Sequence, residues 1–124
     1  MKLTELLEGH SNELGEGISL NVINDLEVKL NIKLPAEFKE FLLKFNYAEI
    51  YSDPIYCINP VIVEIDIYTQ NQHKEHFRNG FLELFANDID GTIYIRPDTG
   101  AVYNATFEEP IANSFTKFVE TLLK

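Results

Sequence analysis

The sequence predicts a mixed α+β fold, with a central antiparallel sheet of about four to five strands flanked by N-terminal helices and a C-terminal helix. Three observations lead to this prediction. Apolar residues recur at helical spacing near both ends of the 124-residue chain. The middle is instead rich in short β-branched and aromatic runs, and turn residues separate these runs. Helices, then several short strands, then a helix is an order typical of α+β domains.

The first long helix is predicted downstream of a linker. Residues 3–8 have the composition of a short helix, and residues 9–17 contain three glycines. Apolar residues then occupy the i, i+3 and i+7 positions of a helix, and a polar residue before them is available as the N-cap. The apolar positions are Ile23, Leu26 and Leu30, and the candidate caps are Ser19 and Asn21.

A second helix is predicted to begin at the Leu34-Pro35 step, because proline is well tolerated in the first turn of a helix. Its apolar residues follow the i, i+3, i+4 and i+7 positions, which indicates one buried face. These residues are Phe38, Phe41, Leu42 and Phe45.

Short strands follow, separated by turns at Asn59-Pro60, Asp90-Gly91 and residues 97–100, and this spacing is typical of an antiparallel meander. The polar residues 66–80 are expected to form a loop with a helical turn. The predicted strands are residues 55–58, 61–65, 81–86, 92–96 and 101–103. The predicted last helix carries Phe115, Phe118, Val119 and Leu122 on one stripe, with Asn113 or Ser114 as its cap.

The charge is strongly acidic and unevenly distributed. Twenty acids and ten bases give a net charge of −10. Residues 45–111 contain eleven of the acids and only three of the bases, and no Lys or Arg lies between Lys44 and Lys74. Such a surface repels phosphate, so we expect no binding to nucleic acid or to an anionic membrane. A basic protein would be attracted, although acidity also serves simply to keep a protein soluble.

No combination of residues predicts catalysis, and we expect no enzyme activity, no metal and no cofactor. His73 and His76 are three residues apart but have no third ligand nearby, so an exposed polar loop is the simpler interpretation. The segment Asp88–Gly91 resembles part of a calcium loop, but the terminal ligands of such a loop are missing, which favours a hairpin turn. Cys57 lies within an apolar run, where burial raises the pKa of a thiol and leaves it inert.

The same observations predict a single domain over residues 1–124 that resides in the cytoplasm. A chain of this length can bury a sufficient core. One cysteine excludes an internal disulfide, and neither a signal peptide nor a run of about 20 apolar residues is present.

Three motifs in order resemble the SUKH superfamily, the Smi/Knr-like domains, over residues 18–124, with residues 1–17 as an N-terminal helix and linker. The first is the Leu-Pro step followed by a helix that ends in Asn46. The second is FANDIDGTIYIRPDTGAVY, residues 85–103, and the third is the closing IANSFTKFVETL, residues 111–122. The chain departs from the family pattern at Asn46-Tyr47-Ala48, where many members have Asn-Gly-Gly.

The resemblance implies an immunity protein of a bacterial polymorphic toxin system, which binds and neutralises a cognate toxin, often a nuclease, without catalysis. Opposite charge would speed its association with a basic toxin domain. The residues expected to bind the partner are exposed acids and a tyrosine: Glu49, Tyr51, Asp53, Asp66, Asp88 and Asp90. We expect a monomer or a weak dimer. Two alternatives stay open, a regulatory or scaffolding domain without a toxin partner, and a hydrolase or metal enzyme that uses the histidine pair.

Overall fold

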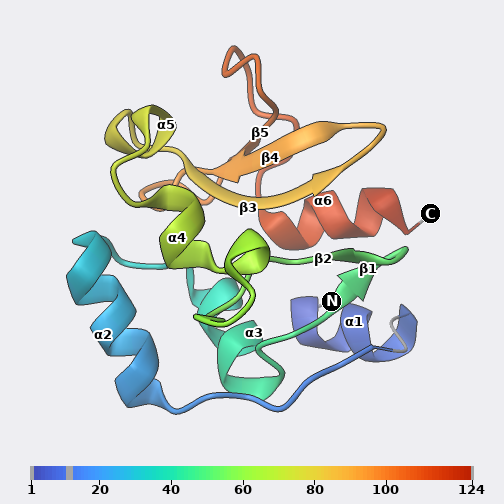
Figure 1. Ribbon diagram of the computed structural model, residues 1–124. Helices are drawn as coiled ribbons and strands as arrows, with labels where there is room; N and C mark the ends of the chain where they lie inside the picture. The colour runs from blue at the N-terminus through green and yellow to red at the C-terminus, as the bar shows by residue number, and fades with distance from the viewer. Residues whose placement is uncertain (1, 11–12, 124) are drawn as a thin grey trace.

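Helices form where the apolar stripes predicted them, and they surround a core of phenylalanine and leucine side chains. The computed structural model describes residues 2–10 and 13–123 and has the predicted α+β class (Figure 1). The helices are α1 (Leu3–His10), α2 (Leu20–Leu30), α3 (Ala36–Lys44), α4 (Ile67–Asn71), α5 (Glu75–Arg78) and α6 (Phe115–Leu122), with a 3-10 turn η1 (Val63–Ile65). No helix in the described ranges is both long and apolar enough to cross a membrane.

The caps and buried faces of α2, α3 and α6 follow the sequence patterns. Ser19 caps α2 by accepting from the Val22 N–H, and Ser114 caps α6 by accepting from the Lys117 N–H. The predicted stripes of α2 and α3 are buried in full. In α6, Phe115, Phe118 and Val119 are buried, whereas Leu122 packs against the core at its margin. The local pattern therefore determines these three helices.

The strands form two small antiparallel sheets rather than one sheet of four to five strands. One contains β1 (Glu49–Ile50) and β2 (Asp53–Pro54), and the other contains β3 (Leu82–Asn87), β4 (Gly91–Ile95) and β5 (Val102–Tyr103) in that order. The two sheets still touch, because the Tyr56 N–H donates to the Leu84 carbonyl at 2.8 Å. The sheet is thus smaller than predicted, and a single hydrogen bond continues it.

Residues 55–58 and 61–65, both predicted as strands, are instead an extended segment with an isolated bridge at Cys57 and a loop ending in η1. Asn59 provides the physical reason. Its side-chain oxygen accepts from the backbone N–H groups of Val61 and Ile62, at 3.1 and 3.0 Å. These amides are then not available for a strand ladder, so local side-chain bonding replaces sheet pairing.

A bulge in β3 shapes the core beneath the larger sheet. The register with β4 shifts between Glu83 and Phe85, so that Leu84 and Phe85, although adjacent, are both buried. The Phe85 ring lies 6.3 Å from that of Phe118 in α6, centroid to centroid. The core therefore lies between the β3–β4 pair and the layer of α1, α3 and α6, which lies below the sheet in Figure 1.

Candidate functional site

Two hairpin turns lie at the same side of the molecule, at the right of Figure 1. They are the β1–β2 turn and the β3–β4 turn, and β2 contacts β3. Five of the six residues that the sequence predicted for partner binding belong to these hairpins. We call this region the hairpin end and define it by Glu49, Tyr51, Asp53, Asp88, Ile89 and Asp90.

The β1–β2 turn presents an exposed tyrosine on a strained backbone. Ile50 pairs with Asp53, so Tyr51 and Ser52 are the two central residues of the turn. Their φ angles are 50° and 73°, as a type I′ turn requires, but neither residue is the asparagine or glycine that this turn favours. The Tyr51 side chain is 70 % exposed. A large aromatic ring is thus held in solvent at an energetic cost, which is a reason to look for a function here.

The β3–β4 turn is confirmed as a hairpin rather than a calcium loop. Asn87 pairs with Gly91 across a three-residue loop, and Gly91 has a φ of 73° that suits glycine. The Asn87 side-chain nitrogen donates to the Asp90 carboxylate at 3.0 Å, which fixes the loop. Ile89, at the tip, is 94 % exposed. Sequence reasoning missed Ile89, although an isoleucine between two aspartates in a turn pointed to solvent exposure.

Glu49 and Asp53 were expected to be exposed but are half-buried, because they lie at the base of the first hairpin and pair within its two strands. The Tyr47 hydroxyl donates a hydrogen bond to the Glu49 carboxylate. This bond, followed by burial, raises the pKa of Tyr47 to about 12, because it stabilises the protonated phenol. The Glu49 carboxylate is therefore held in place as an acceptor.

Asp66 does not join the hairpin end, and the expectation that it is exposed is wrong. Its side chain is 6 % exposed and caps α4, accepting from the Thr69 N–H and the Thr69 hydroxyl at 3.0 and 2.7 Å. It also accepts from the Asn59 N–H at 2.9 Å. The physical reason is that a helical turn, as expected within residues 66–80, begins directly after Asp66 as α4, so the aspartate has the structural role of an N-cap.

The three bases of residues 45–111 lie at the other end of the larger sheet. Lys74 is the N-cap of α5 and Arg78 is its last residue, α5 leads into β3, and Arg96 follows the end of β4. The Arg96 guanidinium is neutralised by Asp98 through two hydrogen bonds of 3.1 Å. The sheet is therefore polarised, with four acids at the hairpin end and the bases opposite.

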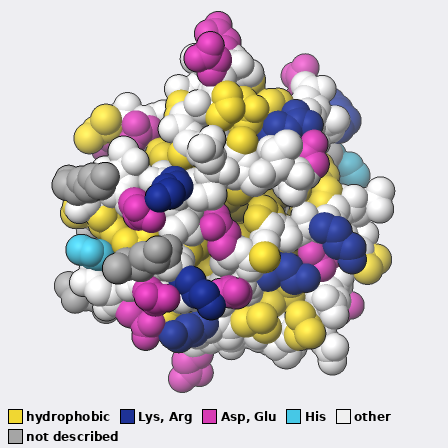
Figure 2. Space-filling model, turned by 180° about the vertical axis from the view of Figure 1, so that it is seen from behind, with side chains coloured by type: hydrophobic (Ala, Val, Ile, Leu, Met, Phe, Trp, Pro, Cys, Tyr) yellow, Lys and Arg dark blue, Asp and Glu magenta, His cyan; other side chains and the backbone are white. Residues whose placement is uncertain are grey.

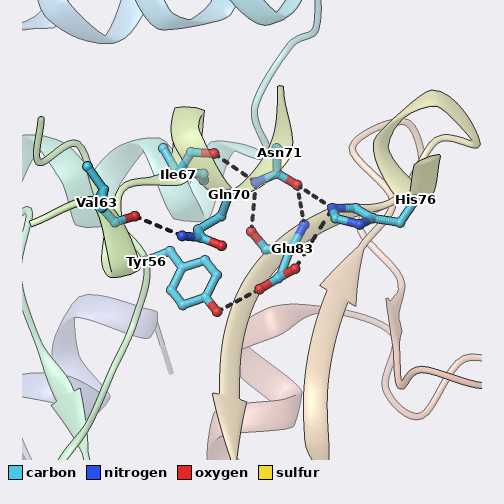
Figure 3. Close-up of polar contacts among 7 residues, drawn as sticks. All are labelled: Tyr56, Val63, Ile67, Gln70, Asn71, His76 and Glu83. Atoms are coloured by element: carbon cyan, nitrogen blue, oxygen red, sulfur yellow. Dashed lines mark hydrogen bonds and ion pairs between the residues drawn. The ribbon is translucent and has the colours of Figure 1, made fainter. Parts of the chain in front are cut away.

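A polar network joins α4 and α5 to β3 (Figure 3). Asn71 is completely buried, and its side-chain nitrogen donates to the carbonyls of Ile67 and Glu83, at 2.8 and 3.0 Å. Its oxygen accepts from the Glu83 N–H at 2.7 Å and lies 3.0 Å from His76 Nε2. The Tyr56 hydroxyl donates to the Glu83 carboxylate at 2.6 Å. Every hydrogen-bonding position of the Asn71 amide is thus used.

The protonation states of His76 and Tyr56 are consistent with a structural role for this network. Because the Asn71 oxygen can only accept, His76 Nε2 must carry the proton. Burial lowers the pKa of His76 despite the nearby Glu83 carboxylate, and burial with the hydrogen bond to Glu83 raises the pKa of Tyr56. Both groups are neutral near pH 7, so the network holds α4 and α5 against β3.

The other chemical candidates show no assembled site in the described part of the chain. His73 is exposed as expected, whereas His76 is half-buried, contrary to the expectation of an exposed pair, because it bonds to Asn71. No group of three His, Cys, Asp or Glu side chains within residues 2–10 and 13–123 is placed to hold a metal ion. Cys57 is buried, and burial raises its pKa to about 11, as predicted.

The α+β fold and the order of its motifs agree with the comparison to known families. The profile of the SMI1 / KNR4 family (SUKH-1) matches residues 17–121. The chain belongs to this family, which includes immunity proteins and is generally of a non-enzymatic type.

A curated protein with a similar segment is a DNA ligase from Mycoplasma capricolum subsp. capricolum (strain California kid). The two are 32 % identical over 89 residues, which is 70 % of this chain and 13 % of the ligase. The chain thus spans only a small part of that protein.

Proposed function

We propose that this chain is a cytoplasmic immunity protein that binds and neutralises a basic toxin domain through the hairpin end. The observation that carries the proposal is the composition of this region. Two separate hairpins place four acids at the same side of the molecule, and their turns carry the exposed residues Tyr51 and Ile89. Membership in a family that includes immunity proteins supports the same function.

The charge layout favours capture of a positively charged protein. A field that is negative at one end of the sheet orients a basic partner before contact and raises the association rate. Tyr51 and Ile89 then supply exposed apolar area on the same hairpins as the acids, and apolar area next to charged groups is typical of a binding hot spot. Tyr51 is the expected anchor, because tyrosine is enriched at hot spots.

The double substitution Asp53→Lys with Asp88→Lys tests the proposal, and the probe is a toxin domain encoded by a neighbouring gene, where such a gene lies beside this one. We expect the association rate to fall about tenfold or more, and its salt dependence to weaken, because two attractive charges become repulsive. Stopped-flow or surface plasmon resonance in a salt series measures both effects. Asp66 is left intact, because its replacement would remove the cap of α4.

Glu5→Lys with Asp25→Lys is the matched control. Both residues are exposed, on α1 and α2, and the pair changes the net charge by the same amount. The control should slow association far less than Asp53→Lys with Asp88→Lys, the hairpin variant, does. Equal effects of the two variants would mean that net charge alone matters and that the hairpin end is not the interface.

A second candidate function is a regulatory or scaffolding interaction domain without a toxin partner. The DNA ligase match favours it, because there a similar segment is a small part of a much longer protein. The neighbouring genes separate the two candidates. A secreted toxin gene next to this one supports immunity, whereas its absence, with binding to an endogenous protein, supports the interaction domain.

A further inference from the structure

Four aromatic rings form a layer on the face of the larger sheet that points away from the helical core. Tyr94 and Tyr103 come from β4 and β5, Phe81 precedes β3, and Phe107 comes from the loop between β5 and α6. Ring centroids lie 5.1 Å apart for Phe81–Tyr103, 4.6 Å for Phe81–Phe107 and 4.7 Å for Tyr94–Phe107. We call these four residues the aromatic patch.

Phe107 is the most exposed ring of the patch and is held there against its backbone preference. It is 36 % exposed, and its φ of 56° is unfavourable for a bulky residue. The Phe107 N–H donates to the Asn104 carbonyl at 3.1 Å, which is a local bond within the loop, whereas the end of the loop is tied to β5 by the Ile111 N–H, which donates to the Val102 carbonyl at 2.7 Å. The surrounding residues 105–111 are exposed. Ring contacts therefore anchor this part of the loop to the sheet.

The patch is acidic on its loop side, whereas its α5 side carries the bases Lys74 and Arg78, because the His76 ring of α5 lies 5.0 Å from the Tyr94 ring. Glu108 and Glu109, next to Phe107, are exposed, and neither forms an ion pair within the described residues. Acidic side chains project at the top of Figure 2, at the height of this loop in Figure 1. Arg96, whose guanidinium lies over the Phe81 ring, already pairs with Asp98. A cation that approaches Phe107 from the loop side thus meets two carboxylates that form no ion pair within the described residues.

The patch already shows how it receives a guanidinium group. The Arg96 side chain crosses Gly80 and places its Cζ 5.2 Å from the centroid of the Phe81 ring. Arginine combines a flat face for stacking with donors for carboxylates, whereas the compact ammonium of lysine is more strongly hydrated. The neighbourhood of Phe107, Glu108 and Glu109 offers both kinds of contact.

We propose that the aromatic patch, together with Glu108 and Glu109, binds an arginine-bearing segment of the protein partner. This inference rests on the proposed function and adds a second contact with a preference for arginine over lysine. Aromatic rings also stack on nucleic-acid bases, but the two glutamates repel phosphate, so the chemistry of the surface favours a protein segment.

Three synthetic peptides serve as probes: one alternates arginine with glycine, one lysine with glycine, and one uncharged citrulline with glycine. Titration into the isotopically labelled protein, followed by NMR, should shift the signals of Phe81, Tyr103 and Phe107 with the arginine peptide. We expect the arginine peptide to bind about three- to tenfold tighter than the lysine peptide. The citrulline peptide should not bind.

Two variants of the aromatic patch and its glutamates test whether the arginine peptide binds there. A third variant, at the hairpin end, tests this inference independently of the proposed function. Phe107→Ala should abolish the preference for arginine. The double variant Glu108→Lys with Glu109→Lys should lower the affinity for the arginine peptide, and it tests the inference even if Phe107→Ala does not fold. The hairpin variant Asp53→Lys with Asp88→Lys should leave the preference unchanged.

The inference is overturned if the patch variants leave the arginine preference intact, or if a single-stranded oligothymidine shifts the patch signals and the arginine peptide does not. In either case, the proposed function survives as long as the hairpin variant slows binding of the toxin domain. If the hairpin variant does not slow binding of the toxin domain while the patch variants abolish the arginine preference, the proposed function fails and the inference about the aromatic patch still holds.

Discussion

Asn71 is a single side chain on which two helices and a strand depend. It is 0 % exposed and makes four hydrogen-bond contacts, two of them with the backbone of Glu83. A buried amide costs free energy unless all of its positions are used, and here they are. The sequence carries no trace of this role, because Asn71 lies in a polar stretch that resembles a loop.

Asn71→Ala should lower the free energy of unfolding by about 2–4 kcal/mol, because it leaves the part-buried N–H and carbonyl of Glu83 without their side-chain partner. Urea unfolding measures the loss. Gln70→Ala is the matched control on the same helix, because Gln70 donates a single exposed bond to the Val63 carbonyl. The control should cost about 1 kcal/mol or less. Equal losses would contradict the assigned role of Asn71.

At the scale of the element, the β1–β2 turn combines an unfavourable backbone with an exposed ring. Asparagine and glycine adopt positive φ more readily than tyrosine and serine do. The chain therefore retains Tyr51 and Ser52 at a cost in stability. A site that sacrifices stability in this way is consistent with a binding role for Tyr51.

The double substitution Tyr51→Asn with Ser52→Gly should raise the free energy of unfolding by about 0.5–1.5 kcal/mol, because it fits the turn type. The same variant should bind the partner less tightly, because the anchor ring is lost. Thermal unfolding and an equilibrium titration measure the two effects. Ser52→Gly alone keeps the ring and is the control. If it weakens binding as much as the double variant does, turn geometry rather than Tyr51 is responsible.

The elements that sequence patterns predicted well are those stabilised by local spacing. The stripes of α2 and α3 needed no distant information. The strand expected at 61–65 failed because one side chain, Asn59, takes two of its backbone amides. Phe85 is buried because β3 has a bulge, and the alternation of side chains along a strand does not predict a bulge.

At the scale of the whole molecule, topology decides which acids act together. Five of the six predicted partner residues meet because two hairpins place their turns at one side of the molecule. Asp66 is separated because it caps α4, and the sequence predicted a helical turn within residues 66–80 without indicating that it begins after Asp66. The position of the bases opposite the hairpin end also follows from strand direction, which composition does not contain.

A net charge of −10 on 124 residues has opposite consequences for folding and for binding. Salt screens the repulsion among acids within the folded chain, and it also screens the attraction toward a basic partner. Added sodium chloride should therefore stabilise the fold, by on the order of 1 kcal/mol, while it slows association with the toxin domain. Urea unfolding, which leaves ionic strength unchanged, measures the first effect, and stopped-flow kinetics the second.

The variant Asp53→Asn with Asp88→Asn is the matched test of where this repulsion resides. It removes two charges from the hairpin end and keeps side chains of nearly the same shape. Both salt dependences should become shallower, because the same acids repel one another in the free protein and attract the partner in the complex. An unfolding midpoint that falls with added salt would show that ion pairs such as Lys44–Glu8, at 3.0 Å, outweigh the repulsion. The polarised charge would then matter for binding alone.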